Sequence, residues 1–141
     1  MENKLMMQFP ARSENEALAR VCAAAFVTPL NPTIADITDI KTAISEAVTN
    51  AIIHGYDGAD MDEPMVHMHL EMRDRRIFVE IRDRGRGIED IERAREPLFT
   101  SKPEQERSGM GFTVMEEFMD SLDIISISGE GTTIKMTKKL G

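Results

Sequence analysis

The sequence has few of the features that place a chain in an oxidising compartment or a membrane. It has one cysteine, Cys22, so an internal disulfide framework is excluded. No apolar run approaches the roughly 18 residues that a membrane-spanning helix needs. The opening residues, MENKLMMQFP, lack the pattern of a signal peptide. We therefore expect a soluble cytoplasmic protein without membrane contact.

Positive charge is also scarce. The chain has 17 Lys and Arg residues against 25 Asp and Glu residues, which gives a formal net charge of -8. Such a surface is poorly suited to neutralising a nucleic-acid backbone, so a direct nucleic-acid partner is disfavoured. The charge excludes neither a basic protein partner nor a metal-bound nucleotide. The length of 141 residues predicts one domain over residues 1–141.

Two hydrophobic periodicities are present along the chain. Alternating apolar residues predict strands over residues 4–9, 66–72, 77–81, 122–127 and 132–137. Helical spacing predicts helices after residue 13, over 33–55, within 89–96 and over 110–119. Helices and strands do not alternate regularly. The pattern therefore favours an α+β two-layer sandwich, with a mixed and mostly antiparallel sheet covered by helices on one face.

The two long helices carry detailed expectations. In the first, Ser13 and Glu16 have the spacing of a capping box, and the apolar residues at helical spacing are Leu18, Val21, Cys22, Ala25 and Phe26. In the second, Thr33 and Asp36 can open the helix and Gly55 fits a C-terminal cap. Its apolar stripe is Ile37, Ile40, Ile44, Val48, Ala51 and Ile52.

A carboxylate and an amide lie within this second helix. Glu46 and Asn50 are four residues apart, so they share one helix face, away from the centre of the apolar stripe. One interpretation is a solvated helix face. The other is a Mg²⁺ site, because Mg²⁺ needs only one or two protein oxygens beside waters and phosphates. The amide oxygen can be a ligand and the carboxylate can be a base.

Three glycine-containing stretches follow. In DRGRGI, Asp83 ends a strand and Gly85 and Gly87 follow, so a carboxylate there could accept a hydrogen bond from an exocyclic amine such as adenine N6. In SGMGF, glycines precede a helix whose N-terminal N–H groups could contact phosphate, although the P-loop spacing is absent. GEGTT has the composition of an ordinary turn between two strands. Each stretch alone also fits a turn without any ligand.

Together, these stretches fill different needs of a single ligand. They offer a metal-binding amide, an adenine-reading carboxylate, a helix start for phosphate, and a covering segment in TSKPEQERSG. The three histidines do not form a zinc pattern, and His67 and His69 alternate on a strand, as surface or edge residues do.

The order of these stretches resembles the GHKL ATPase superfamily, which includes gyrase, chaperone, histidine-kinase and mismatch-repair ATPases. EAVTNAIIHG resembles its asparagine box, DRGRGI its first glycine box, SGMGF its second, and GTT its terminal threonine box. The resemblance spans residues 46–133 and implies a Bergerat-type ATP-binding fold.

A closer resemblance covers essentially the whole chain. The single small domain, the segment PLFTSKPEQERSGMGF, the helix TVMEEFMD and the opening FPARSENEALAR are similar to the sporulation anti-sigma factor F family, serine kinases of endospore-forming bacteria. This resemblance implies inhibition of a sporulation sigma factor and ATP-dependent phosphorylation of a serine on an anti-anti-sigma factor. It also implies a homodimer formed through the sheet region, and a partner-binding surface that includes Arg20.

The same resemblance implies roles for individual residues. Asn50 ligates Mg²⁺, and Glu46 is the base that accepts the serine hydroxyl proton. Asp83 binds adenine N6, Thr133 supports Asp83 through a hydrogen bond, and the pocket around the purine is shaped by Gly85, Gly87 and Ile88.

The residues expected to close over the ATP or ADP phosphates lie between residues 100 and 112. They are Thr100, Lys102, Ser108, Gly109, Met110, Gly111 and Phe112. Lys102 and Arg107 could neutralise phosphate charge. Two other interpretations stay open: a stress-response type of anti-sigma kinase with a different sigma partner, and a non-catalytic module in which nucleotide only sets the shape of a sigma-binding dimer.

Overall fold

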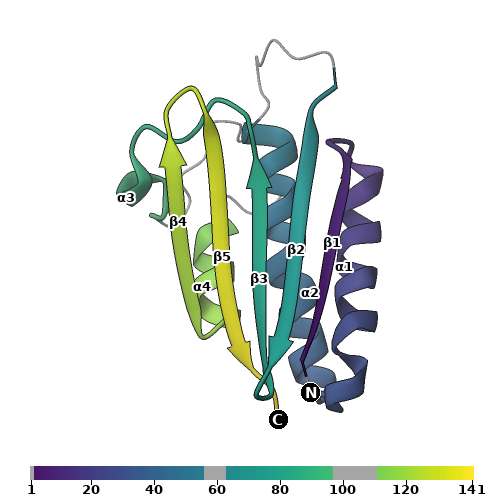
Figure 1. Cartoon of the computed structure of the whole chain (residues 1–141). Helices are drawn as coiled ribbons and strands as arrows, with labels where there is room; N and C mark the ends of the chain where they lie inside the picture. Colours follow the sequence, from purple (N-terminus) through teal and green to yellow (C-terminus); the bar gives the residue numbers. More distant parts are fainter. Residues whose placement is uncertain (1, 56–62, 97–110) are drawn as a thin grey trace.

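The computed structural model describes residues 2–55, 63–96 and 111–141, with the backbone alone at residues 54 and 55. In these ranges a sheet of five strands has the order β1-β2-β3-β5-β4, and every neighbouring pair is antiparallel. The strands are β1 (Asn3–Pro10), β2 (Met65–Arg73), β3 (Arg76–Asp83), β4 (Ser121–Ile127) and β5 (Gly131–Lys139). Because β5 inserts between β3 and β4, the last strand of the chain is an interior strand of the sheet (Figure 1).

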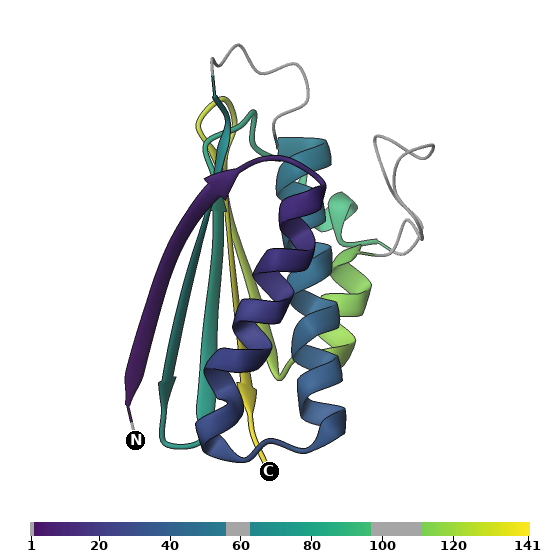
Figure 2. The ribbon, with the colours of Figure 1, turned by 90° about the vertical axis from the view of Figure 1, so that its right-hand side faces the viewer.

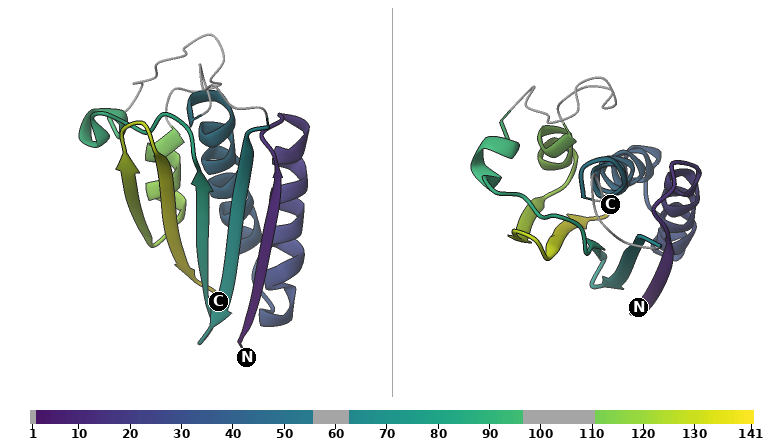
Figure 3. Two further views of the ribbon diagram at one scale, coloured as in Figure 1. Left: turned by 45° about the horizontal axis from the view of Figure 1, so that its top comes forward. Right: turned by 90° about the horizontal axis from the view of Figure 1, so that it is seen from above.

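The helices cover one face of this sheet. Figures 2 and 3 show α1, α2 and α4 side by side in one layer, with the strands in the other. The helical segments are α1 (Glu14–Val27), η1 (Thr28–Leu30), α2 (Ile34–Asn50), η2 (Ala51–Gly55), α3 (Ile91–Ala94) and α4 (Gly111–Phe118). The expected α+β two-layer sandwich with helices on one face is confirmed.

The core lies between the two layers, where the alternation of the strands predicted it. On β2 the side chains of Val66, Met68, Leu70 and Met72 are buried, and on β3 those of Ile77, Val79 and Ile81 are buried. Residues between them face the uncovered side of the sheet, because successive side chains of a strand point to opposite faces. Within the described ranges, no helix combines the length and apolar character needed to cross a membrane.

The buried stripe of α1 differs from the prediction. Ala19, Ala23 and Val27 are fully buried, whereas Leu18 and Val21 are 47% and 57% exposed. Buried residues at i, i+4 and i+8 that are mostly alanine allow α1 to pack closely against α2. The predicted Cys22 and Phe26 are half-buried and pack against the core, so the predicted stripe is wrong only in part.

The predicted capping box at Ser13 is wrong, whereas the one at Thr33 is confirmed. Ser13 itself has helical backbone angles and makes no side-chain cap, and Glu16 instead forms an ion pair with Arg20 at 3.1 Å. Thr33 has an extended backbone, so its hydroxyl can accept from the N–H of Asp36 while the Asp36 carboxylate accepts from the N–H of Thr33. The α-helix that Thr33 starts ends at Asn50, and a π-helical turn continues to Gly55.

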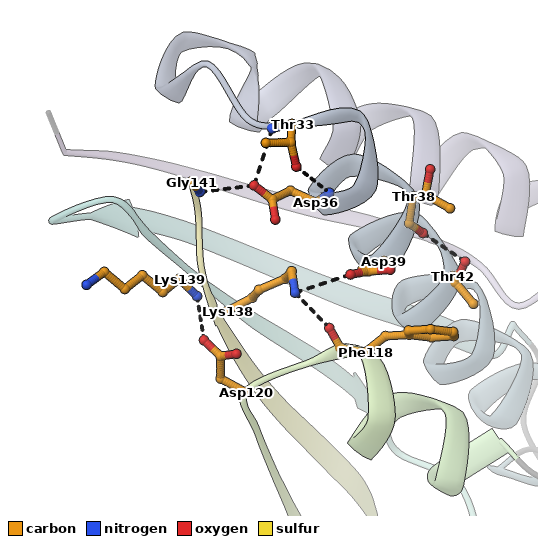
Figure 4. Close-up of polar contacts among 10 residues, drawn as sticks. All are labelled: Thr33, Asp36, Thr38, Asp39, Thr42, Phe118, Asp120, Lys138, Lys139 and Gly141. Carbon is orange, nitrogen blue, oxygen red and sulfur yellow. Dashed lines mark hydrogen bonds and ion pairs between the residues drawn. The ribbon is translucent and has the colours of Figure 1, made fainter.

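The end of β5 is tied to the start of α2, as Figure 4 shows. The backbone N–H of Gly141 donates to the Asp36 carboxylate at 3.0 Å, and this bond is the main cause of the lowered pKa of Asp36. The ammonium group of Lys138 contacts the Asp39 carboxylate at 3.3 Å and donates to the backbone carbonyl of Phe118 at 3.1 Å. Lys138 therefore joins α2 to the C-terminal end of α4.

Candidate functional site

The predicted site residues that the structure describes gather toward one end of the molecule. Figure 1 shows that the C-terminal end of α2, the C-terminal end of β3 and the turn between β4 and β5 all lie at this end. The turn Ala51–Gly55 contacts both β3 and β5, which brings the end of α2 against the sheet there. Segments that are far apart in the sequence therefore meet around Asp83.

Asp83 is a buried carboxylate at the last position of β3, with 6% of its surface exposed. Its side chain points toward the helix layer, because it follows Ile77, Val79 and Ile81 at a spacing of two. The backbone N–H of Gly85 donates to Asp83 Oδ1 at 2.9 Å. Burial raises the pKa of Asp83, and hydrogen bonds from the backbone N–H groups of Gly85 and Thr132 oppose this only in part. Asp83 is therefore a hydrogen-bond acceptor that is largely shielded from water.

The threonine that supports Asp83 is Thr132 rather than Thr133. Asp83 lies directly opposite Thr132 in the β3–β5 pairing, and Thr132 is buried with it. Thr133 lies opposite Arg82, and opposed residues of an antiparallel pair share a face, so Thr133 is on the uncovered side of the sheet. The expected hydrogen bond from Thr133 to Asp83 is therefore wrong by one residue. A spacing of two from the buried Ile134 and Met136 would have identified Thr132 from the sequence.

Replacing Asp83 with asparagine is expected to raise the free energy of unfolding at pH 7. The pKa of Asp83 is raised by folding, so its stabilising contribution exists below its unfolded pKa and is lost as the pH rises through its folded pKa. At pH 7 the ionised, buried carboxylate destabilises the fold, whereas an amide oxygen can still accept from the N–H of Gly85. Urea unfolding at pH 7 and at pH 4.5 should show that the gain shrinks as the pH falls.

The control for this prediction is Asp123→Asn, which removes the same charge from an exposed position on β4. We expect that change to leave stability within about 0.5 kcal/mol of wild type. An Asp83→Asn protein less stable than wild type at pH 7 would mean that the hydrogen bonds of the carboxylate outweigh its burial.

The glycine stretch after Asp83 packs against the β4–β5 turn. The backbone N–H of Gly129 donates to the carbonyl of Arg86 at 2.7 Å, and the N–H of Ile88 donates to Ser126 Oγ at 2.7 Å. A Cβ at Gly87 would lie 2.5 Å from the carbonyl oxygen of Ile127, so only glycine fits there. The glycine stretch after Asp83 and the β4–β5 turn thus form one unit, although they are far apart in the sequence.

Gly131 makes the closest approach within this unit. A Cβ at this position would lie 2.2 Å from the backbone oxygen of Asp83 and 2.8 Å from the Cα of Arg84. The start of β5 therefore presses on the backbone of the residue that is the buried acceptor of the site.

Glu46 and Asn50 are both half-buried on α2, so a fully solvated helix face does not describe them. The Asn50 Nδ2 atom is buried and has no hydrogen-bond partner among the residues that the structure describes. An unsatisfied buried amide is unusual in a folded protein and is expected where a polar ligand binds. Asn50 therefore fits a role in holding a phosphate or a hydrated cation, with Nδ2 as donor and Oδ1 as acceptor.

The described ranges contain no group of three or more His, Cys, Asp and Glu side chains that could hold a metal ion. A cation that relies on protein carboxylates and imidazoles alone is therefore not accommodated by these residues. Mg²⁺ bound to a nucleotide differs, because phosphates and waters supply most of its ligands. A single protein oxygen such as Asn50 Oδ1 fits that donor set.

The start of α4 supplies the last described part of the site. Gly111 is the first residue of this helix, and Gly111 and Phe112 are both buried. The guanidinium of Arg95, the residue that follows α3, forms an ion pair with the Glu116 carboxylate of α4, with Nε donating to Oε1 at 2.8 Å. The remaining predicted phosphate-covering residues lie outside the described residues: Thr100, Lys102, Arg107, Ser108, Gly109 and Met110.

The other predicted residues are Arg20 and the two histidines of β2, of which His67 lies opposite Arg82, beside Asp83. Arg20 is on α1 with 38% of its side chain exposed, where it pairs with Glu16. His67 and His69 are half-buried on the uncovered face of the sheet, and β2 is an interior strand. Of the two expected placements, surface or edge, only the edge placement is therefore wrong. Burial and the nearby charges of Arg82 and Arg84 lower the pKa of His67.

Comparison with known proteins identifies relatives over nearly the full length. The family model of the histidine kinase-like ATPase domain matches residues 9–138. An anti-sigma F factor of Clostridium perfringens is 56% identical over 141 residues, with 99% of both chains covered. An anti-sigma F factor of Oceanobacillus iheyensis is 54% identical over 142 residues, covering 99% of this chain and 94% of the relative. One from Bacillus licheniformis is 53% identical, with the same coverage.

A solved structure supports the fold. The crystal structure of the RsbU and RsbW domains of a Mycobacterium tuberculosis protein superposes with a TM-score of 0.70 at 22% sequence identity. The match covers 98% of this chain but 32% of that longer chain. At this identity the likeness establishes a shared architecture.

Proposed function

Because the chain belongs to the anti-sigma F factor family and carries a histidine kinase-like ATPase domain, we propose that it inhibits a sporulation sigma factor and phosphorylates a serine of an anti-anti-sigma factor. The domain implies that the chain binds ATP or ADP and acts as an ATP-using kinase. The observation that carries the proposal is that one end of the fold holds both a buried carboxylate acceptor and an amide whose Nδ2 has no described hydrogen-bond partner. These are Asp83 and Asn50.

Each residue would act through ordinary polar chemistry. ATP supplies the phosphoryl group that is transferred. The Asp83 carboxylate would accept a hydrogen bond from adenine N6, and the half-buried Asn50 amide would hold Mg²⁺ through Oδ1. Glu46, one helical turn earlier, would accept the proton of the serine hydroxyl. The protein therefore contributes mainly alignment and charge placement, as phosphoryl transfer requires.

The protein partners would use two other surfaces. Arg20 lies on α1, which also exposes the apolar side chains of Leu18 and Val21, so this helix offers both charged and apolar groups to a sigma factor. The uncovered sheet face also has exposed apolar side chains, with Met6 at 77% and Ile125 at 51%, which supports a homodimer formed through the sheet. A partner of a bacterial sigma factor would act in the cytoplasm.

The proposal is tested by incubating the purified chain with radiolabelled ATP, Mg²⁺ and a candidate anti-anti-sigma protein. We expect label on that protein, and we expect serine-to-alanine replacement in it to abolish labelling. Capture of the sigma factor by the chain in the presence of nucleotide tests the second activity. Sigma capture without any labelling would instead favour a non-catalytic module in which nucleotide only sets the shape of the dimer.

Replacing Asn50 with alanine is expected to weaken ATP binding by at least tenfold in the presence of Mg²⁺. The variant removes both the buried amide donor and the proposed Mg²⁺ ligand. Binding in EDTA should change much less, since only the metal-dependent part involves Oδ1. Isothermal titration calorimetry with and without Mg²⁺ measures both quantities. Asn3→Ala, an exposed change at the start of β1, is the control. Wild-type affinity in the Asn50 variant would contradict the assignment.

A further inference from the structure

Ser126 lies at the junction between the glycine stretch after Asp83 and the β4–β5 turn, and nothing in the proposed function accounts for it. We propose that Ser126 is a positioning residue that holds Asp83 and Ile88 in the geometry that selects adenine. The inference rests on the proposed nucleotide site and adds a determinant of its specificity. Ser126 itself would not touch the reacting atoms.

The hydroxyl of Ser126 makes three contacts at hydrogen-bond distance. It accepts from the backbone N–H of Ile88 at 2.7 Å, lies 2.9 Å from the Thr132 hydroxyl, and donates to the carbonyl of Gly131 at 3.2 Å. A serine hydroxyl has one donor and two acceptor positions. If Ser126 donates to Gly131, the Thr132 hydroxyl donates to Ser126, and all three positions are used.

This arrangement connects both ends of the glycine stretch, Asp83 and Ile88, to the Ser126 hydroxyl and its neighbour Thr132. Thr132 is the strand partner of Asp83, and its backbone N–H donates to the Asp83 carboxylate. Ile88 is five residues after Asp83, yet it is held by the same hydroxyl that contacts Thr132. Ser126 therefore fixes the separation between the buried carboxylate and Ile88, which would line the pocket for the purine.

The residues inside the glycine stretch are also held in place, by contacts of their backbone. Arg86 is held by the N–H of Gly129, and Gly87 packs against the backbone of Ile127. The contacts of Arg86 and Gly87 are made by backbone atoms, whereas the Ile88 N–H donates to the Ser126 side chain, which can be removed without altering the backbone. Its removal leaves the N–H of Ile88 without this acceptor, which favours a shift of the stretch.

The chain offers a matched control on the same pair of strands. Ser121 Oγ lies 2.6 Å from Thr137 Oγ1, and this exposed pair also joins β4 to β5, at the opposite end from the glycine stretch. Ser121→Ala thus removes a hydroxyl pair between the same strands without touching the Asp83 region. Ser126→Thr keeps the hydroxyl and serves as the rescue variant.

The experiment measures ATP and GTP affinities by calorimetry for wild type, Ser126→Ala, Ser126→Thr and Ser121→Ala. We expect Ser126→Ala to lower the ATP-to-GTP affinity ratio by about fivefold to tenfold, which corresponds to one lost hydrogen bond. Ser126→Thr should restore most of the ratio, and Ser121→Ala should leave it unchanged. A general loss of protein stability would weaken the binding of ATP and GTP equally. A change in the ratio of the two affinities therefore indicates a positioning role for Ser126 rather than an effect on folding.

A second measurement keeps the inference testable if nucleotide affinities are hard to compare. Hydrogen exchange of the Ile88 amide in the nucleotide-free protein should be faster in Ser126→Ala than in wild type or Ser121→Ala. If Ser126→Ala does not fold, Thr132→Val, which removes one donor to Ser126, should lower the affinity ratio by about twofold.

An unchanged ratio together with unchanged exchange at Ile88 would overturn the role of Ser126 while leaving ATP binding intact. A wild-type protein that binds no nucleotide would overturn the proposed function, and this inference with it. The two failures are thus distinguished by the behaviour of the wild type.

Discussion

Replacing Glu46 with glutamine is expected to lower phosphate transfer to the protein substrate by about 10²–10⁴-fold, the range for loss of a general base. Glutamine keeps the size of the side chain and one acceptor oxygen, but it cannot accept the serine proton. Nucleotide binding and sigma factor binding should remain near wild type, because both use other residues. Single-turnover transfer from radiolabelled ATP, together with calorimetric titration of ATP, separates the chemical step from binding.

The matched control is Glu117→Gln, which makes the same chemical change at an exposed position on α4. It should transfer phosphate at the wild-type rate. Unchanged transfer by Glu46→Gln would remove Glu46 from the role of base. Loss of nucleotide binding in that variant would instead assign Glu46 a part in holding the ligand or the end of α2.

Replacing Gly131 with alanine is expected to destabilise the protein by about 3 kcal/mol and to weaken ATP binding by at least tenfold. The φ angle of +128° at Gly131 is strained for any residue with a Cβ. The added Cβ would also meet the backbone of Asp83 and Arg84, neither of which can move as a flexible side chain would. Positive φ costs about 1–2 kcal/mol and overpacking about 1–3 kcal/mol. Relief of this overlap must shift Asp83.

Gly129 supplies the control for this prediction. Its φ angle is +82°, but a Cβ there would meet nothing within 4 Å. Gly129→Ala should therefore cost about 1–2 kcal/mol through backbone strain alone and leave ATP affinity unchanged. Urea unfolding and calorimetry of both variants test the comparison. Equal effects of the two changes on ATP affinity would show that the contact between Gly131 and Asp83 has no part in binding.

The strands of the sheet could be predicted because the alternation of apolar and polar residues is visible within each short segment of the sequence. Alternation of apolar residues on β2 and β3 directly reports which side chains face the helices. The face of α1 was harder to predict, since its buried seam uses Ala19 and Ala23, whose small size matters only once the neighbouring helix is in place. Ser13 failed as a cap because its backbone is helical, whereas a capping residue has an extended backbone that lets its side chain reach the helix N–H groups.

The site was predictable to the extent that it depends on short stretches. Asp83 was located at a strand end, and Glu46 and Asn50 on one face of α2, from local spacing alone. The role of Ser126 could not be read from the sequence, because its partner Ile88 is 38 residues away and is reached only through strand pairing. The choice between Thr132 and Thr133, in contrast, could have been made from the sequence, because Thr132 shares the alternation of the buried Ile134 and Met136.

The contact between Arg95 and Glu116 joins the residue that follows α3 to α4, and α4 also packs on α2. Both side chains are partly in solvent, with 34% of Arg95 and 44% of Glu116 exposed, so their ion pair contributes little to the free energy of unfolding. Its main effect is to set the position of α3 against α4. High ionic strength should therefore loosen α3 without unfolding the rest of the protein.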